Sequence, residues 1–230
     1  MKPVNQIKKN TKQPLAVTAY ETIIRKIISL EYQPSQHLEE NQLVEDLGIG
    51  RTPIREALVR LRGEKMLESH PNKGVVVRPI TIQNAKAMFE SMEIIELGIA
   101  KLAMNKETTA FIPQMKEANR LLKDAFHAND TFNLTEANHL FHMNFAKCSH
   151  NEFLCRADNE VRNEAKRLSF LSYDNIIDPK IPLKDHFESV INEHNEMIAC
   201  LEEKNKDQLK QIIIKHIQTF RERIILFMIS

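Results

Sequence analysis

Apolar residues recur every three or four positions along most of this chain, which is the spacing of helices that bury one face. In the first third of the chain this pattern predicts a helix over residues 17–30 and a short helical segment over 43–47, closed by Gly48. A third helix is expected to begin with Thr52 as its N-cap and Pro53 at its first helical position. Because two helices joined by a tight turn with glycine form a helix-turn-helix, we expect that motif here.

Two short apolar runs follow the third helix, over residues 66–69 and 74–78, around a polar turn at 70–73. This pattern predicts a β-hairpin. A hairpin directly after a helix-turn-helix forms a wing, so we expect a winged helix-turn-helix of three helices and a β-hairpin wing over residues 14–79.

From Thr81 to the end of the chain the spacing predicts only helices. We expect them at about 82–104, 108–128, 131–147, 151–174, 184–203 and 206–228, with a long loop at 175–183 that contains two prolines. The predicted fold is therefore mostly α, with the winged helix followed by an all-α antiparallel bundle of about six helices over 80–230. The domain boundary is expected near Pro79.

Composition bounds the class of protein. At 230 residues and 42% hydrophobic content, the chain can bury two modest cores. Its apolar runs are too short to span a bilayer and its N-terminus is too polar for a signal peptide, so we expect a cytoplasmic protein without a membrane partner. The three cysteines lack Cys-x-x-Cys spacing, which favours free thiols over a disulfide or zinc-thiolate site.

Basic residues are concentrated near the predicted helix-turn-helix, although the net charge is only +1. Residues 1–13 form a basic arm that either contacts phosphates or is a disordered tail. Arg51 and Arg55 lie on the polar side of the third helix, near its N-terminus. An arginine there can bond a guanine bidentately, although the spacing alone also fits an ordinary solvated face.

Three stretches together resemble the GntR family of bacterial transcription regulators: the segment ending in Leu47-Gly48, the run RTPIREALVRL at 51–61, and Asn72-Lys73-Gly74-Val75. The resemblance implies that Arg51, Thr52 and Arg55 touch bases and phosphates, and that Lys73 and Gly74 make wing-tip contacts. Arg60 on the same helix is a further candidate. Some relatives carry an arginine where this chain has Asn41, so their operator preference does not transfer.

Three histidines fall within apolar stripes of three predicted bundle helices: His142, His194 and His216. Asn138 lies four residues before His142, hence on the same helix face. One buried histidine is more often a hydrogen-bonded structural residue than a ligand. Three that face one bundle interior favour a metal site, because bundles build such sites from facing helices.

The histidines extend the resemblance to the FadR-like branch of the family, whose FCD domain holds a divalent metal with an aspartate, a histidine four residues on, and one histidine from each of two later helices. His142, His194 and His216 match this set, whereas Asn138 stands where aspartate is usual. A neutral amide oxygen should lower affinity and favour zinc or nickel over harder cations, and loss of the metal is an open alternative. We expect His139 to face solvent or lie outside the ligand shell.

Many relatives also have an arginine in the first bundle helix that clamps the carboxylate of a small organic acid. This chain has Met92 at that position. Arg162 and Arg167 are candidate replacements in the effector pocket, with surface arginines as the alternative.

The expected function is that of a homodimeric repressor that binds a pseudo-palindromic double-stranded DNA operator. We expect a small metabolite, an organic acid bound at the metal-containing pocket, to modulate its affinity for the operator. Two alternatives stay open: a metal-dependent hydrolase using the three histidines, and a ligand-independent repressor. Against the hydrolase, Glu193 and Glu196 flank His194 and are expected to point away from its face.

Overall fold

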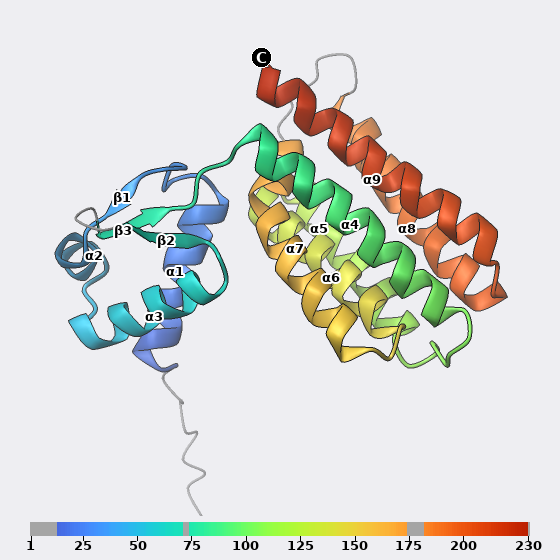
Figure 1. Ribbon diagram of the computed structural model, residues 1–230, viewed down its shortest axis with the longest axis horizontal. Helices are drawn as coiled ribbons and strands as arrows, with labels where there is room; N and C mark the ends of the chain where they lie inside the picture. Colours follow the sequence, from blue (N-terminus) through green and yellow to red (C-terminus); the bar gives the residue numbers. More distant parts are fainter. Residues whose placement is uncertain (1–12, 71–73, 174–181, 230) are drawn as a thin grey trace, which may run out of the picture.

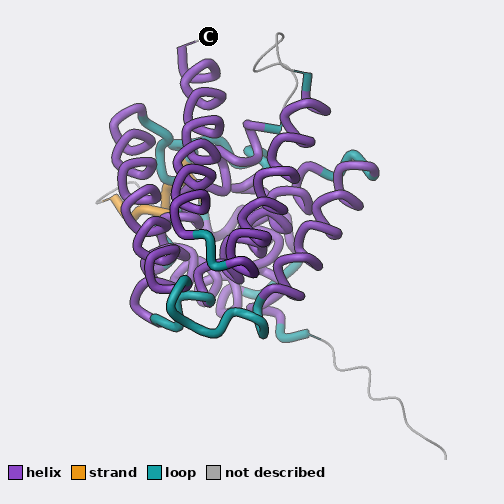
Figure 2. The backbone as a smooth tube through the Cα atoms, turned by 90° about the vertical axis from the view of Figure 1, so that its right-hand side faces the viewer, coloured by secondary structure: helices purple, strands orange, loops and turns teal. Residues whose placement is uncertain are grey.

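The computed structural model describes residues 13–70, 74–173 and 182–229, with side chains up to residue 226. The proposed basic arm, most of the proline-containing loop and the wing-tip Lys73 lie outside these residues. Within them the chain forms nine helices and three strands, arranged as a small mixed domain beside a long helical bundle (Figures 1 and 2). The predicted mostly α architecture is thereby confirmed.

The smaller domain consists of α1 (Leu15–Ile28), β1 (His37–Leu38), α2 (Glu40–Leu47), α3 (Arg51–Gly63), β2 (Leu67–His70) and β3 (Gly74–Val77). Its core is built from the apolar faces of the three helices and the inner face of the sheet. In α3 these buried positions are Ile54, Ala57, Leu58 and Leu61, as the spacing predicts. The other face of α3 is therefore free to meet a partner.

The start of α3 differs from the expectation. Gly50, in extended conformation, is the N-cap and Arg51 is the first helical residue, so Thr52 is not the cap. The reason is that the carbonyl of Gly50 already accepts from the amide of Ile54. Pro53 remains within the first turn, where its missing N–H is not needed. Gly48 closes α2 with a φ of 62°, as predicted.

The sheet has three strands rather than the two of the predicted hairpin, in the order β1-β3-β2, and all pairs are antiparallel. The sequence pattern missed β1 because two residues are too few to show an alternation. Gly74 begins β3 with a φ of 69°, and a Cβ there would lie 3.0 Å from His37 Nε2. The positive φ therefore favours glycine here, and a larger residue would also have to displace the His37 side chain.

The bundle contains six helices within the described residues: α4 (Ile82–Ala103), α5 (Ile112–His127), α6 (Thr131–Lys147), α7 (Glu152–Ser172), α8 (Leu183–Glu203) and α9 (Lys206–Ile229). The side chain of Thr81 caps α4 by accepting from the amide of Asn84. Helix α5 starts four residues later than predicted, since the preceding residues form hydrogen-bonded turns. Among the residues described, none of the helices combines the length and apolar character that crossing a membrane requires.

Helices α6 and α7 join the bundle to the smaller domain. Phe132 of α6 and Phe170 of α7 pack against the core of the smaller domain, and the Arg25 guanidinium lies 3.9 Å from the centre of the Phe132 ring. The linker residue Arg78 pairs with Glu164 of α7. Residues of α6 and α7 therefore form part of the contact between the two domains.

Candidate functional site

Three histidines from three helices meet inside the bundle: His142 of α6, His194 of α8 and His216 of α9. Each offers a ring nitrogen within 4.8 Å of the others, and all three side chains are buried. The Nε2 atoms of His142 and His216 are 3.3 Å apart. Two nitrogens at 2.0–2.1 Å from a tetrahedral zinc would be about 3.3–3.4 Å apart, so this spacing suits two ligands of one ion.

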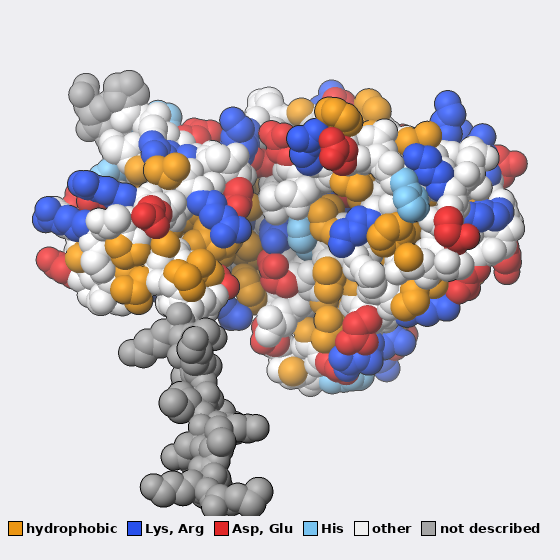
Figure 3. Space-filling model, turned by 90° about the horizontal axis from the view of Figure 1, so that it is seen from below, with side chains coloured by type: hydrophobic (Ala, Val, Ile, Leu, Met, Phe, Trp, Pro, Cys, Tyr) orange, Lys and Arg blue, Asp and Glu red, His pale blue; other side chains and the backbone are white. Residues whose placement is uncertain are grey.

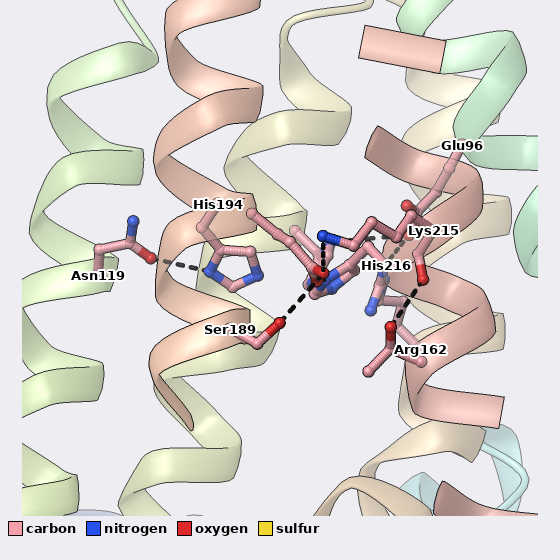
Figure 4. Close-up of polar contacts among 10 residues, drawn as sticks. Glu96, Asn119, Arg162, Ser189, His194, Lys215 and His216 are labelled. Atoms are coloured by element: carbon pink, nitrogen blue, oxygen red, sulfur yellow. Dashed lines mark hydrogen bonds and ion pairs between the residues drawn. The ribbon is translucent and has the colours of Figure 1, made fainter. Parts of the chain in front are cut away.

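Neighbouring polar groups orient two of these rings. Nδ1 of His194 donates to Asn119 Oδ1 over 2.8 Å (Figure 4). The Asn119 amide nitrogen in turn donates to Asn195 Oδ1. Nδ1 of His216 donates to Glu193 Oε2, also over 2.8 Å. Because Nδ1 carries the proton in each case, Nε2 keeps its lone pair for a metal, as in carboxylate–histidine–metal arrangements.

Glu193 corrects one expectation. It does not point away from the histidines but is buried and bonded to His216. The helical turn of about 100° from His194 directs Glu193 toward α9 rather than toward solvent. Glu196, in contrast, is exposed, as predicted.

The residues present fit a divalent ion. Nε2 of His194 and Oδ1 of Asn138 are buried and have no hydrogen-bond partner. Burial lowers the pKa of His142 and His194 well below the usual histidine range, which keeps these rings in the neutral form that binds metals. A bound ion would give the orphaned atoms a partner.

A small cavity of ≈ 20 Å³ adjoins the histidines. Met92, Asn138, Arg162, Glu193 and His216 are among its lining residues, so the position of the family's arginine and one candidate replacement reach the same space. That volume holds about one water molecule.

Arg162 is not a surface residue: its side chain is 5% exposed. Its guanidinium pairs with the buried carboxylate of Glu96 on α4 (Figure 4). Asp158, one turn earlier on α7, has an oxygen 4.0 Å from Arg162 Nε. Burial raises the pKa of Asp158 to about 7 and lowers that of Arg162 to about 9.

Arg167 is also buried, which excludes the surface alternative, but it does not line the cavity. Its Nη1 donates to the carbonyl oxygen of Arg78, and its side chain borders a groove of ≈ 850 Å³ between the two domains. Arg167 therefore belongs to the domain junction. His139 lies on a different face of α6, where it borders a groove between α5 and α6, and burial lowers its pKa to about 3.

Asn119, Glu193, Glu96 and Asp158 are site residues that sequence reasoning missed. A signal was present for two of them, since Asn119 and Glu96 interrupt the apolar stripes of α5 and α4 at buried positions. A polar residue at such a position needs a partner inside the protein.

The candidate nucleic-acid surface lies at the N-terminal end of α3. Arg51, Thr52 and Arg55 are exposed there, and the Arg55 guanidinium is held by the carboxylate of Glu40 at 2.8 Å. Figure 1 places this end of α3, together with α2 and the start of β3, at the edge of the domain farthest from the bundle. Lys and Arg side chains gather at that edge in Figure 3. Gly74 is exposed beside it.

Arg60 is held elsewhere. Its guanidinium lies 3.5 Å from the centre of the Tyr20 ring and pairs with Glu64 at 2.9 Å. Nine residues separate it from Arg51, which places the two side chains on opposite sides of α3. Arg60 therefore serves the packing of α3 on α1.

Comparisons with known proteins agree with this arrangement. The family model described as "Bacterial regulatory proteins, gntR family" matches residues 15–77, and the "FCD domain" model matches residues 87–219. The chain is similar to the uncharacterized HTH-type transcriptional regulator YdhC of Bacillus subtilis, at 22% identity over 88% of each chain. It is also similar to the HTH-type transcriptional repressor RspR of Escherichia coli, at 20% identity over 94% of this chain and 91% of that protein.

Among solved structures, E. coli McbR/YncC shares the fold with a TM-score of 0.73 at 20% identity, over 94% of this chain and 99% of that one. The two family models cover both domains in the order that the structure shows, and the FCD match alone spans more than half of the residues. The chain therefore belongs to the GntR family of bacterial transcription regulators, in the branch that carries an FCD domain.

Proposed function

We propose that this transcription regulator binds a specific DNA operator through α3 and that a ligand at the histidine centre sets its operator affinity. DNA binding through α3 is supported by the exposure of Arg51, Thr52 and Arg55 at one end of this helix. The opposite face of α3 is buried in the core of the small domain. Arg55 would exchange Glu40 for a base edge or a phosphate. Gly74 and Lys73 would follow the backbone beside it.

A homodimer would place two α3 helices in successive major grooves of a pseudo-palindrome, about one helical turn apart. We assign the chain to the bacterial cytoplasm, where the chromosome lies. Repression is the direction of control that we propose, supported by the name of the relative RspR.

In the bundle, Asn138, His142, His194 and His216 would hold zinc or nickel, because three imidazoles and an amide oxygen suit these ions better than hard cations. When bound, the ion offers a positive charge to an oxygen of a small organic acid in the adjoining cavity. Asn119 and Glu193 keep the rings oriented, and Arg162 supplies a second cationic group from α7.

Coupling to DNA would pass through α6 and α7. Both helices line the cavity and both pack against the smaller domain through Phe132 and Phe170. A ligand that binds one arrangement of these helices more tightly shifts the population toward it and so changes operator affinity.

The hydrolase alternative would need a carboxylate free to act as a general base near the histidines. Glu193 has three partners: Nδ1 of His216 at 2.8 Å, Nζ of Lys215 at 3.3 Å and the hydroxyl of Ser189 at 3.3 Å. These contacts support a positioning role instead.

The test is selection of operator fragments from genomic DNA by the purified protein, followed by footprinting and affinity measurement. Arg55→Ala should weaken operator binding by roughly 1–3 kcal/mol and relax base preference if Arg55 reads a guanine. Arg156→Ala, which changes an exposed arginine of the bundle, is the matched control. Equal affinity for every duplex, with or without zinc and organic acids, would refute the proposal.

A further inference from the structure

A buried acid–base cluster lies beside the histidines, formed by Glu96 of α4 and by Asp158 and Arg162 of α7. The exposed fractions of these residues are 0%, 0% and 5%. Two carboxylates face one guanidinium, an expensive arrangement in a protein interior. The metal centre by itself does not explain why this charge is buried.

Arg162 lines the cavity, yet its guanidinium already holds a carboxylate. Oε1 of Glu96 pairs with Nη2 of Arg162, and Oδ1 of Asp158 lies 4.0 Å from Nε of the same guanidinium. A small carboxylic acid that entered the cavity would find the positive charge of Arg162 already neutralised by Glu96, so it would have to compete with that carboxylate.

We propose that Glu96 is an internal competitor for acids: its carboxylate occupies the guanidinium that recognises the effector, and a small carboxylate binds by displacing it from Arg162. This inference rests on the proposed effector site and assigns its ligand class and its selectivity. Glu96 thereby sets the acid concentration at which the regulator responds.

The displaced carboxylate has a second partner within reach. The same Oε1 atom lies 3.7 Å from Nδ1 of His142, and that nitrogen has no hydrogen-bond partner. Once released from Arg162, Glu96 can accept a hydrogen bond from Nδ1–H, which orients Nε2 of His142 in the way that Glu193 orients His216. Acid binding at Arg162 and metal binding at His142 then support each other.

Size and charge restrict the acid. The free cavity of ≈ 20 Å³ admits only a small ligand even after Glu96 moves. The incoming negative charge adds to two resident carboxylates, so a nearby cation favours its entry. The ligand class is a short-chain carboxylate bound together with the metal.

A side-chain deletion provides the first test. Glu96→Ala removes CγH₂–COO⁻, a fragment with the shape of acetate, and leaves Arg162 facing the space. At a concentration of roughly 100 times its Kd, acetate should raise the Tm of this variant by about 5 °C and leave that of the wild type unchanged. Acetamide, which has the same shape without the charge, should have no effect.

Glu90→Ala is the matched control, because Glu90 is an exposed glutamate of the same helix. Its Tm should not respond to acetate. Absence of an acetate-specific rise in folded Glu96→Ala, or an equal rise in the wild type, would overturn the proposal. Metal-free and zinc-treated protein are measured in parallel.

A second variant, Glu96→Gln, has a side chain of nearly the same shape as glutamate. It tests the proposal even if Glu96→Ala does not fold. Glu96→Gln retains the buried volume, and Asp158 still offers Arg162 a negative partner. Zinc-treated Glu96→Gln should bind formate at least 10-fold more tightly than the wild type by calorimetry, and Arg162→Met added to it should abolish the gain. Unchanged formate affinity contradicts the inference. Neither measurement uses DNA, so a failure of operator binding would be recognised separately.

Discussion

The two cores of this chain treat polar groups in opposite ways. Among the described residues of the smaller domain, every buried side chain is apolar, and all buried polar or charged side chains lie in the bundle or the loops that join its helices. Buried charges and unpaired polar groups destabilise a fold, and a small core has little surplus stability to offset them. The side chains that we propose to contact DNA accordingly lie on the surface of the small domain, whereas those that we propose to bind a ligand lie inside the larger one.

The strongest way to test this division is to remove a histidine. His142→Ala should weaken zinc binding by on the order of 3 kcal/mol, or more than about 100-fold, since a four-ligand zinc site is worth roughly 10–16 kcal/mol in total. Competition with a chromogenic chelator measures this loss. His127→Ala, at an exposed position of α5, is the control. Zinc affinity equal to that of the wild type would show that His142 is not a ligand and would remove the ligand chemistry assigned to the bundle interior.

A smaller effect on zinc affinity is expected at Glu193, which contacts the proposed ligand His216 and not the metal itself. Glu193→Gln keeps the shape but weakens the hydrogen bond to His216, and zinc affinity should fall by about 10–100-fold. Glu196→Gln changes an exposed neighbour and should leave affinity unchanged. Equal affinities for the two variants would show that Glu193 does not position His216.

The pH dependence of stability should also reside in the bundle. Burial lowers the pKa of His186 to about 3 from an unfolded value of 6.5, so its stabilising contribution is complete above pH 6.5 and is lost as pH falls below it. The loss approaches about 1.4 kcal/mol per pH unit for this one group. Asp158 acts in the opposite direction, because its raised pKa favours the folded state as pH falls below about 7.

Urea unfolding of metal-free wild type and His186→Gln between pH 7 and pH 5 separates this ring from the other buried groups that titrate in the same range. His186→Gln should flatten the curve by the slope of one group, whereas His70→Gln, on the exposed end of β2, should not. Identical slopes for wild type and His186→Gln would show that this ring is not the source.

The smallest effect concerns Arg60. Because its guanidinium stacks on Tyr20, Arg60→Ala should lower the stability of the small domain by about 0.5–1 kcal/mol and change operator affinity less than Arg55→Ala does. A loss of operator affinity as large as that of Arg55→Ala would restore Arg60 to the DNA surface.

Helices could be predicted from the sequence where the spacing of apolar residues repeats over several turns. Residues such as Ile54 and Leu61 repeat the helical spacing, and Thr81 and Gly48 mark ends by their capping chemistry. The two residues of β1 are too few to show an alternation of apolar and polar side chains, so only their pairing with β3 identifies them as a strand. The cap of α3 was misplaced because Gly50 and Thr52 are both acceptable there, and the backbone decides between them.

The histidines of the candidate site could be found for the same reason: a polar residue on an apolar stripe identifies the face that it shares. The direction of Glu193 could not, because it depends on which helix lies beside α8. The same holds for Arg162 and Arg167, five residues apart on α7, one in the cavity and one at the linker. Helix neighbours are tertiary information that one-dimensional spacing does not contain.

The placement of Phe170 has a consequence for how the molecule comes apart. This half-buried ring packs against the core of the small domain although it is carried by a bundle helix, and Phe132 does the same from α6. A fragment ending at Pro79 would leave the apolar surface beneath both rings open to water. Heating should therefore melt the two domains in one cooperative step rather than in sequence.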